Sequence, residues 1–497
     1  MPNQPSLSKR PSSNSKDVSP PPSKRRQQST TTSKAVANFF TPASKKEPEK
    51  MIWRVVKDSL LVGRFNIAAQ SVTQGKRRIA AFDFDSTLIT TASGKTFSRD
   101  ASDWKWWDSS VPGRLKELHT DGFLVAIISN QGGISLKPDP KTVKSDQKRL
   151  ADFKTKVTAV FNQLDFPISI YAATSRDQYR KPRTGMWNEL IEDYDLENAE
   201  SIDLENSVFV GDAGGREAVA GGVKDHSCVD RDFAANVGIP FHTPEEYFRH
   251  EDPRPFVRAF EPAAYTEERA DGSAPALAAN TFTQPVTPEI VMFCGSPGSG
   301  KSSFYWKHLQ PLGYGRVNQD ILKTREKCVK AATALIEEGT SVVIDNTNAD
   351  PETRAVWTTL AQKLKVPIRC VLFAATPKLC EHNDTFRALN IGPEVSLLAK
   401  PPPVREYRKM LSAHYFKFVI TLPDVEIGCA GHPMLTCNLR QKTNRESRTI
   451  LPHIAFSGFA SRYREPKPSE GFANIIKTDF QFEGSEEQRL LWSKYWI

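Results

Sequence analysis

The chain has few cysteines and no long apolar run. Its 497 residues include seven cysteines and no Cys-x-x-Cys pair. Disulfide-stapled domains are far richer in cysteine, so a reducing compartment fits best. No run approaches the roughly 18 apolar residues that cross a membrane, and the basic N-terminus has no apolar segment behind it. We therefore expect neither secretion nor membrane insertion.

The body of the chain also has almost no net charge. Residues 1–50 hold ten Lys or Arg and three Asp or Glu, which is +7 of the total of +9, so the other 447 residues carry only +2. Any attraction to nucleic acid in the body would come from local patches. Because no base-reading module is recognisable, such contact would be with the backbone and sensitive to salt.

The N-terminal tail is expected to be disordered, because it has almost no apolar residues before Val36. Lys9-Arg10 and Lys24–Arg26 are two basic clusters with a polar spacer, the pattern of a nuclear import signal, although a generic solvated arm has the same composition. The expected localisation is nuclear.

A second feature of the tail indicates a partner. Val36 precedes the adjacent aromatics Phe39 and Phe40, and exposed aromatics in a polar tail usually mark a segment that orders on binding. The segment resembles the motif that binds the replication sliding clamp, with Ser33 where that motif has Gln. We therefore expect a clamp contact through Val36-Phe39-Phe40.

The first site begins where the apolar run 79–82 ends in two carboxylates one residue apart. On an extended strand alternate side chains share a face, so Asp83 and Asp85 would point the same way. Two such charges need a cation between them or a shared proton, and Mg²⁺ suits carboxylate oxygens. One carboxylate could attack phosphorus while the other moves a proton. An Asp-x-Asp at an ordinary strand-to-loop turn is the alternative.

Strands and helices alternate after this point, which predicts a parallel sheet with helices on both faces. We expect helices over 113–119 and 146–164 and strands over 123–128, 168–172 and 208–210. In such sheets ligands bind beyond the carboxyl ends of the strands. Polar side chains stand at those places: Ser129, Lys181 and Asp212.

These four positions resemble the four motifs of the haloacid-dehalogenase-type phosphatases. The resemblance implies that Asp83 is the nucleophile that becomes a phosphoaspartate and that Asp85 is the acid and base. It also implies that Ser129 and Lys181 hold the phosphoryl oxygens. Asp212 would join Asp83 and the carbonyl oxygen of Asp85 around Mg²⁺.

A second centre follows the apolar run 290–294, where Gly-Ser-Pro-Gly-Ser-Gly-Lys-Ser opens a helix. Between a strand and a helix, this spacing is the phosphate-binding loop. Its glycines let backbone N–H groups curl around phosphate oxygens, its lysine reaches the β- and γ-phosphates, and its last serine binds Mg²⁺. ATP and Mg²⁺ are the expected cofactors. The residues that would hold them are Gly295, Ser296, Gly298, Gly300, Lys301 and Ser302.

Further polar residues follow the next expected elements of this second half. Asp320 is the candidate base for a substrate hydroxyl. Asp345 ends the buried run 341–344, and with Asn346 and Asn348 it is expected to orient metal or substrate. Arg387 could fold over the transferring phosphate as an arginine finger does.

Taken together, the two halves resemble the polynucleotide kinase 3′-phosphatase family over about residues 51–390 and 441–497. The stretches 88–95, 179–187 and 345–348 carry the resemblance beyond the superfamily motifs. It implies an enzyme that repairs DNA ends (nicks, gaps and double-strand breaks) by hydrolysing 3′-phosphates and transferring the γ-phosphate of ATP to 5′-hydroxyls. The tail is too short for the phosphopeptide-binding domain of animal members, as in a fungal-like form, and Gln319 stands where many members have Arg.

The expected fold class is therefore α/β, with two tandem parallel-sheet domains in a monomer. We expect the disordered basic tail over 1–50, a phosphatase domain over 51–250, a linker over 251–288 and a kinase domain over 289–497. Residues 391–440 match no expected element. They are either a genuine insertion or a translated, unspliced intron, and we favour the intron.

Two other classes of function stay open. A small-molecule phosphatase fused to a metabolic kinase would share both sites, but it would not need a basic tail with a docking-like segment. A catalytically inactive DNA-end scaffold would need no catalytic side chains, yet every expected one is present.

Overall fold

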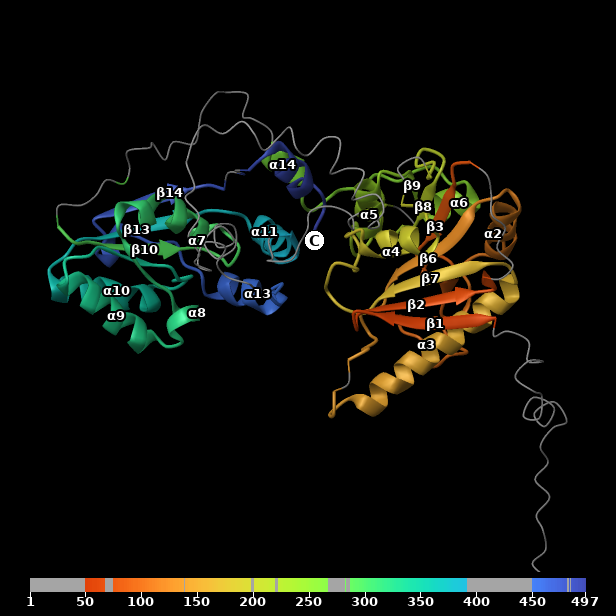
Figure 1. The fold of residues 1–497 in the computed structure, drawn as a ribbon, viewed down its shortest axis with the longest axis horizontal. Coiled ribbons are helices and arrows are strands. Elements are labelled where there is room, and N and C mark those ends of the chain that lie inside the picture. Colours follow the sequence, from red (N-terminus) through yellow and green to blue (C-terminus); the bar gives the residue numbers. More distant parts are fainter. Residues whose placement is uncertain are drawn as a thin grey trace, which may run out of the picture. The chain divides into compact units, whose positions relative to one another are not determined.

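The computed structural model describes residues 50–67, 75–137, 139–197, 201–219, 222–266, 282, 287–390, 449–480, 482 and 484–497 (Figure 1). By its internal contacts the chain divides into Met1–Lys50 and Met51–Ile497. The expected tail, with its clamp-like segment Val36-Phe39-Phe40, and the segment 391–440 lie outside the described residues. Among the described helices none is both long and apolar enough to cross a membrane.

The first of two main sheets has seven strands in the order β1-β2-β7-β6-β3-β8-β9. Its strands are β1 (Met51–Val56), β2 (Leu60–Phe65), β3 (Ile79–Phe82), β6 (Leu124–Asn130), β7 (Ile168–Ala173), β8 (Val208–Val210) and β9 (Phe241–His242). From β7 to β9 neighbouring strands run parallel, as expected. A two-stranded sheet of β4 (Ile89–Thr90) and β5 (Lys105–Trp106) stands beside it.

One edge of the sheet adds a feature that the sequence analysis did not anticipate: β1 and β2 form an antiparallel hairpin, and β2 pairs antiparallel with β7. Three residues join the two strands, which is far too short for the crossover that a parallel pair needs. Lys57 and Asp58 make the turn with φ of 47° and 53°, in the left-handed region that tight turns use.

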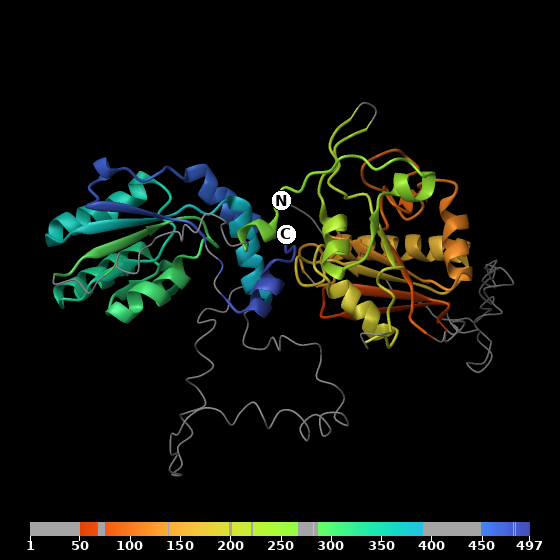
Figure 2. The same ribbon diagram turned by 90° about the horizontal axis from the view of Figure 1, so that it is seen from above.

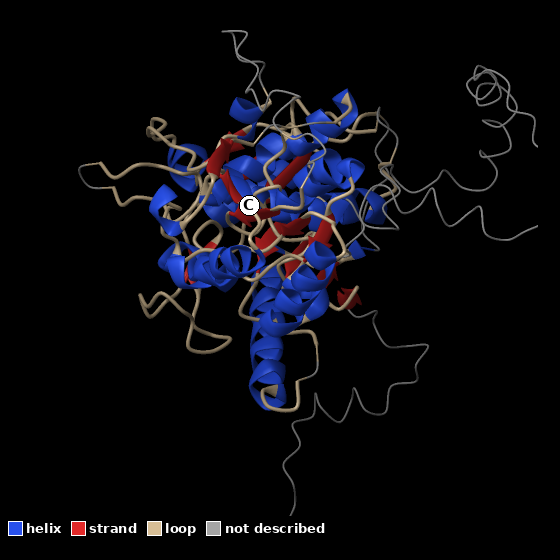
Figure 3. Ribbon diagram, turned by 90° about the vertical axis from the view of Figure 1, so that its left-hand side faces the viewer, coloured by secondary structure: helices blue, strands red, loops and turns tan. Residues whose placement is uncertain are grey.

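Helices cover both faces of this sheet. Figure 3 distinguishes the helices and strands of the chain by colour. One face packs on α2 (Val111–Thr120), α3 (Val143–Leu164) and α6 (Pro244–Arg249), and the other packs on α4 (Gly185–Asp193) and α5 (Val229–Val237). In α3, Phe153, Val157 and Phe161 recur every four residues and are buried. A stripe at that spacing is what fixes an amphipathic helix on a sheet.

The second main sheet has five parallel strands in the order β11-β12-β10-β13-β14. They are β10 (Ile290–Cys294), β11 (Gly315–Val317), β12 (Val342–Ile344), β13 (Ile368–Phe373) and β14 (Asn474–Thr478). One face packs on α9 (Arg325–Glu337) and α10 (Pro351–Leu364), and the other on α7 (Lys301–Phe304) and η4 (Tyr305–Leu309). Figure 2 shows these layers from above. The remaining helices are α8 (Gln319–Leu322), α11 (Pro377–Asn390), α13 (His453–Arg462) and α14 (Glu486–Trp492).

Strand β14 comes from the far end of the chain and pairs with β13 along its whole length. The sequence analysis did not anticipate this strand. Short 3-10 turns complete the structure, including Pro262–Tyr265 within the expected linker. Phe256, which also lies in the expected linker, forms an antiparallel β-bridge with Arg216 in the loop after β8. This bridge ties the described part of the linker to the first sheet.

Arg354 of α10 is a fully buried cation that joins three parts of the second sheet region. Its guanidinium donates to both carboxylate oxygens of Glu470, at 2.7 and 2.8 Å. The same group donates to the carbonyl oxygens of Asn348, Ala349 and Arg464. Arg354 therefore fixes the loop after β12 against the segment that leads into β14.

Replacing Arg354 by Ala should destabilise this region by about 3–5 kcal/mol, because the substitution removes the cation that pairs with Glu470 and its hydrogen bonds to three carbonyl oxygens. Thermal unfolding of the full chain measures the change. The control is Lys378→Ala, which removes an exposed ion pair with Glu381 and should change stability little. Equal effects of the two substitutions would contradict the assignment.

Candidate functional site

The first candidate site lies beyond the carboxyl ends of the parallel strands of the seven-stranded sheet. Asp83 follows β3, Ser129 is near the end of β6, and Asp212 follows β8, so the sheet brings all three to one edge. The backbone N–H of Asp83 donates to the carbonyl oxygen of Val210 at 2.8 Å, which fixes the end of β3 against β8. The sheet order thus places these three predicted positions at the edge where ligands bind in such sheets.

Three carboxylates and one ammonium group form the centre of this site. Asp83, Asp212 and Asp230 offer oxygens that all lie within 4.8 Å of one another. Lys181 Nζ lies 2.9 Å from Asp83 Oδ1 and 2.8 Å from Asp230 Oδ1. The side chains of Lys181 and Asp230 are each only 1% exposed, so this ion pair is shielded from water.

Burial and mutual repulsion change the acidity of this cluster. Burial first, and then the neighbouring charges of Asp83 and Asp230, raise the pKa of Asp212 to about 8. The pKa of Asp230 is also raised, mainly by burial, although Lys181 opposes the change. Burial alone would lower the pKa of Lys181, but the two carboxylates beside it raise the value above its usual range. The cluster therefore has an excess of negative charge that favours a bound cation.

Asp230 is a site residue that the sequence analysis missed. It stands in the first turn of α5, where an acidic residue is common for helix stability alone, so no local signal distinguished it. Its Oδ2 accepts from the backbone N–H of Ala213 at 3.0 Å, which fixes the loop that carries Asp212. A Cβ at position 211 would lie 2.4 Å from Asp230 Oδ2, so only glycine fits there.

Asp85 and Ser129 are linked by a second residue that the sequence analysis did not single out, Gln131. Its Nε2 donates to Asp85 Oδ2 at 2.6 Å and to Ser129 Oγ at 3.0 Å. The residue surface of Asp85 is open to solvent, but protein atoms crowd its carboxylate, and this desolvation raises its pKa. The Gln131 hydrogen bond opposes that shift. Asp85 thus lies at the mouth of the site with its proton more tightly held than usual.

This donor set fits Mg²⁺. It offers only oxygen ligands, and the raised pKa of Asp212 reflects a repulsion that a dication would offset. The carboxylates of Asp83 and Asp212 are the ones that the sequence assigned to the metal. Asp230 is the third carboxylate within reach, and Lys181 already neutralises part of its charge.

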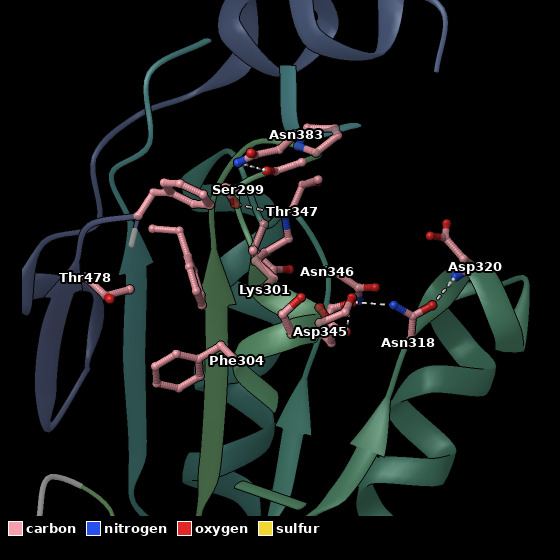
Figure 4. A pocket seen from close by; sticks show the side chains of 18 of the residues that line it. Ser299, Lys301, Phe304, Asn318, Asp320, Asp345, Asn346, Thr347, Asn383 and Thr478 are labelled. Carbon is pink, nitrogen blue, oxygen red and sulfur yellow. Dashed lines mark hydrogen bonds between the residues drawn. The ribbon is translucent and has the colours of Figure 1, made fainter. Parts of the chain in front are cut away.

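The second candidate site is built around the loop between β10 and α7 (Figure 4). Gly298 and Gly300 have φ of 76° and 93°, and a Cβ on Gly298 would lie 2.2 Å from the Cys380 carbonyl oxygen. Lys301 Nζ donates to the carbonyl oxygens of Ser296 at 2.6 Å and Gly295 at 3.0 Å. The loop therefore has the curled backbone that the glycine spacing predicts.

Ser302 and Asp345 meet beyond the end of β12. Ser302 Oγ donates to Asp345 Oδ2 at 2.9 Å, and Asp345 is only 2% exposed. A hydroxyl and a carboxylate are both ligands that Mg²⁺ accepts, so this pair also fits the ion. The side chain of Asn318 donates to the Asp345 carbonyl oxygen at 2.6 Å, which ties the end of β11 to the end of β12.

Asp320 stands in the first turn of α8, and its position is set by Asn318. The side-chain oxygen of Asn318 accepts from the backbone N–H groups of Asp320 at 2.9 Å and Ile321 at 3.3 Å, which caps the helix. Asn346 Oδ1 accepts from the backbone N–H of Gln319 at 2.9 Å. Asp320 is exposed and lines the same cavity as Asp345.

The residues expected to contact substrate are placed differently from one another. Asn346 is partly exposed, whereas Asn348 is 1% exposed and donates from its side chain to the Phe293 carbonyl oxygen at 2.7 Å. Asn348 also has a positive φ of 42°. Its side chain therefore supports the end of β10, next to the phosphate-binding loop.

Arg387 lies on α11 with its guanidinium 2.7 Å from Asp384 Oδ1. Asp384 is buried, and its other oxygen accepts from the backbone N–H of Leu451 at 2.8 Å. The same helix touches the phosphate-binding loop, because Asn383 Nδ2 donates to the Gly298 carbonyl oxygen at 3.2 Å. Trp492 of α14 donates in turn from its indole to Asn383 Oδ1 at 3.0 Å.

These side chains border one cavity of about 1420 Å³. Residues from the phosphate-binding loop, α8, the end of β12 and α11 line it, as Figure 4 shows for the labelled side chains. Its rim carries several cationic side chains: Lys307, Lys323, Arg325, Arg387, Arg462 and Lys477. The arrangement can hold an extended polyanion beside a nucleotide.

Both sheet regions match families of known proteins. The polynucleotide kinase 3 phosphatase family matches residues 78–248, and an AAA domain family matches residues 290–397. The chain is 35% identical over 427 residues to the bifunctional polynucleotide phosphatase/kinase of Schizosaccharomyces pombe, which covers 86% of this chain and 84% of that protein. It is 29% identical over 214 residues to the polynucleotide 3′-phosphatase of Saccharomyces cerevisiae, which covers 34% of this chain and 87% of that protein.

Replacing Asp212 by Asn should stabilise the metal-free protein by an amount that grows as the pH rises from 4 to 8. In the folded chain the pKa of Asp212 is raised from 3.8 to about 8. Between these pH values the folded chain keeps a proton that the unfolded chain has lost, so the free energy of unfolding of the wild type falls as the pH rises. Asparagine cannot ionise and escapes that loss.

Thermal unfolding in EDTA at several pH values tests this, with roughly 2–4 °C expected for each kcal/mol. The matched control is Asp103→Asn, because hydrogen bonds from Arg99 and Ser93 hold the pKa of Asp103 at about 2, so its charge is constant over this range. A difference between wild type and Asp212→Asn that does not change with pH would contradict the prediction.

Proposed function

The chain belongs to the bifunctional polynucleotide phosphatase/kinase family, and from this premise we propose that it repairs DNA ends by removing 3′-phosphates and phosphorylating 5′-hydroxyls. The observation that supports the proposal is that each of the two sheets gathers its own group of charged and hydroxyl side chains beyond its strand ends. The first combines Asp83, Lys181 and Asp212. The second combines Lys301 and Ser302 with Asp345.

At the first site Asp83 attacks the phosphorus of a 3′-phosphate. A bond forms from its carboxylate oxygen to phosphorus, and the bond from phosphorus to the 3′-oxygen breaks. Asp85, whose raised pKa favours the protonated form, gives its proton to that leaving oxygen. Asp85 then takes a proton from the water that hydrolyses the acyl phosphate, which releases phosphate and restores Asp83.

The other residues of the first site bind and orient the phosphoryl group. The Lys181 ammonium, 2.9 Å from Asp83, neutralises charge on the phosphoryl oxygens, and the Ser129 hydroxyl donates to one of them. Mg²⁺, held by Asp83, Asp212 and the Asp85 carbonyl, would supply further positive charge at the phosphate. Asp230 is a positioning residue, since it holds Lys181 and the Asp212 loop.

At the second site the loop from Gly295 to Ser302 holds the phosphates of ATP. Lys301 reaches the β- and γ-phosphates, and Ser302 and Asp345 would hold Mg²⁺, which neutralises them. Asp320 takes the proton of the 5′-hydroxyl as the hydroxyl oxygen attacks the γ-phosphorus. The bond from the γ-phosphorus to the β–γ bridging oxygen breaks, and ADP leaves. Arg387, supported by Asp384, stabilises charge on the transferring group.

The remaining proposals concern substrate and location. The cations around the second cavity contact the phosphate backbone of a strand end, so binding weakens as salt rises. We assign the phosphatase to 51–250 and the kinase to 289–497, with 251–288 as the linker. The basic clusters Lys9-Arg10 and Lys24–Arg26 direct the chain to the nucleus, and Val36-Phe39-Phe40 binds a sliding clamp.

Asp83→Asn should lower 3′-phosphatase activity on the order of 10³-fold or more and leave kinase activity within about twofold. Lys301→Ala should do the reverse. The substrate is nicked DNA with a 3′-phosphate and a 5′-hydroxyl, assayed with Mg²⁺ and labelled ATP. If either substitution stopped both reactions, the assignment of two independent sites would be wrong. Failure of both reactions in the wild-type chain would instead support an inactive scaffold, and activity on small phosphates alone would support the metabolic alternative.

Asp320→Asn should lower the rate of 5′-phosphorylation about 10²- to 10⁴-fold, because it removes the base. Binding of a non-hydrolysable ATP analogue should stay unchanged, since Asp320 does not belong to the phosphate-binding loop. The control is Glu326→Gln, an exposed acid on the neighbouring helix α9, which should keep full activity. Loss of analogue binding in Asp320→Asn would contradict the assigned role.

A further inference from the structure

Arg316 is a nearly buried cation that lies directly against the pair expected to hold magnesium in the second site. Its Nε donates to Asp345 Oδ2 at 2.8 Å, and its Nη2 is 2.5 Å from the same oxygen. Nη2 also donates to Ser302 Oγ at 3.1 Å. Neither the motif analysis nor the mechanism above uses this residue.

The surroundings of Arg316 fix the guanidinium in this place. The residue lies on β11, opposite Val343 of the neighbouring strand β12. Its guanidinium lies over the rings of Tyr305 and Trp306, 5.6 and 5.4 Å from their centroids. The side chain is 8% exposed and that of Asp345 is 1% exposed, so the charges interact with little screening by water.

One oxygen atom is the point of conflict. Asp345 Oδ2 accepts from two nitrogens of Arg316 and from the Ser302 hydroxyl. A metal ion bound by Ser302 and Asp345 would approach the same two oxygens that Arg316 contacts. The guanidinium nitrogen Nη2 lies 2.5 Å from Asp345 Oδ2 and 3.1 Å from Ser302 Oγ, so it takes up the space beside both oxygens that a metal ion would need. Two positive charges that close repel each other.

We propose that Arg316 competes with Mg²⁺ for Asp345 and so sets the metal concentration at which the second site binds nucleotide. Without the dication, Arg316 neutralises the buried carboxylate and holds Ser302 and Asp345 together. When Mg²⁺ arrives with ATP, the guanidinium leaves Asp345 Oδ2. Arg316 is thus a positioning residue, and this role rests on the proposed function of the site.

Calorimetric binding of a non-hydrolysable ATP analogue to the full chain, over a series of Mg²⁺ concentrations, tests the competition without any measurement of turnover. In Arg316→Gln the Mg²⁺ concentration for half-maximal binding should fall about tenfold, within the usual range of coupling between two ligands. The variant should also unfold at a lower temperature than wild type in EDTA, because Asp345 loses its counter-ion, and this difference should shrink when Mg²⁺ and the analogue are present.

The matched control is Arg369→Gln, which removes a partly buried arginine from an ion pair with Glu289 in the same sheet. It should leave the Mg²⁺ dependence unchanged. Arg316→Lys provides a second test if the glutamine variant does not fold, because lysine keeps the charge but has a single donor group. The Mg²⁺ midpoint of Arg316→Lys should be lower than that of wild type, but by less than about tenfold.

An unchanged or higher Mg²⁺ midpoint in the Arg316 variants would overturn the proposal. So would weaker analogue binding at saturating Mg²⁺ with no change in midpoint, because that result would mean that Arg316 binds phosphate. Wild-type protein that failed to bind the analogue at any Mg²⁺ concentration would refute the kinase assignment itself. The two failures are therefore distinguishable.

Discussion

Both candidate sites depend on one constraint: a carboxylate withdrawn from water needs a positive charge beside it. An isolated buried carboxylate is so costly that it takes up a proton or a counter-ion. In the first site Lys181 forms ion pairs with Asp83 and Asp230, and in the second Arg316 forms an ion pair with Asp345. These resident cations offset the charge of oxygen clusters whose donor atoms also fit a metal ion. Each cluster therefore depends on the cation beside it.

Side-chain amides hold the loops that carry the functional groups. A side-chain amide carries both a donor and an acceptor, so one residue can hydrogen-bond to a backbone carbonyl and to a backbone N–H that have no partner in a helix or strand. In each case here the amide nitrogen donates to a backbone carbonyl in or next to a functional segment. The residues are Asn130 (to Lys181), Asn318 (to Asp345), Asn348 (to Phe293) and Asn383 (to Gly298). These contacts hold in place the backbone next to the functional side chains.

Local patterns predicted the parts of the molecule that local chemistry determines. The Asp83-x-Asp85 step and the glycine spacing before Lys301 each require a particular backbone, so the sequence alone located both strand ends. Asp230 and Arg316 escaped notice because their roles come from pairings made across the sheet. Asp230 looks like an ordinary first-turn acid, and Arg316 looks like a polar residue on a short strand. The pairing of β2 with β7 and that of β14 with β13 were missed for the same reason, since partners far away in sequence decide whether an extended segment joins a sheet.

The place of β14 in the chain has a consequence for biosynthesis. Synthesis of the seven-stranded sheet is complete at residue 242, where its last strand, β9, ends. The five-stranded sheet is complete only at residue 478, where its outer strand, β14, ends. Until then β13 presents an unpaired edge, which is the kind of surface on which nascent chains aggregate. The five-stranded sheet is thus the part of the protein whose strand edge stays unpaired for longest during synthesis, and the part for which protection by chaperones matters most. Messages cut short after β9 can still encode every strand of the first sheet.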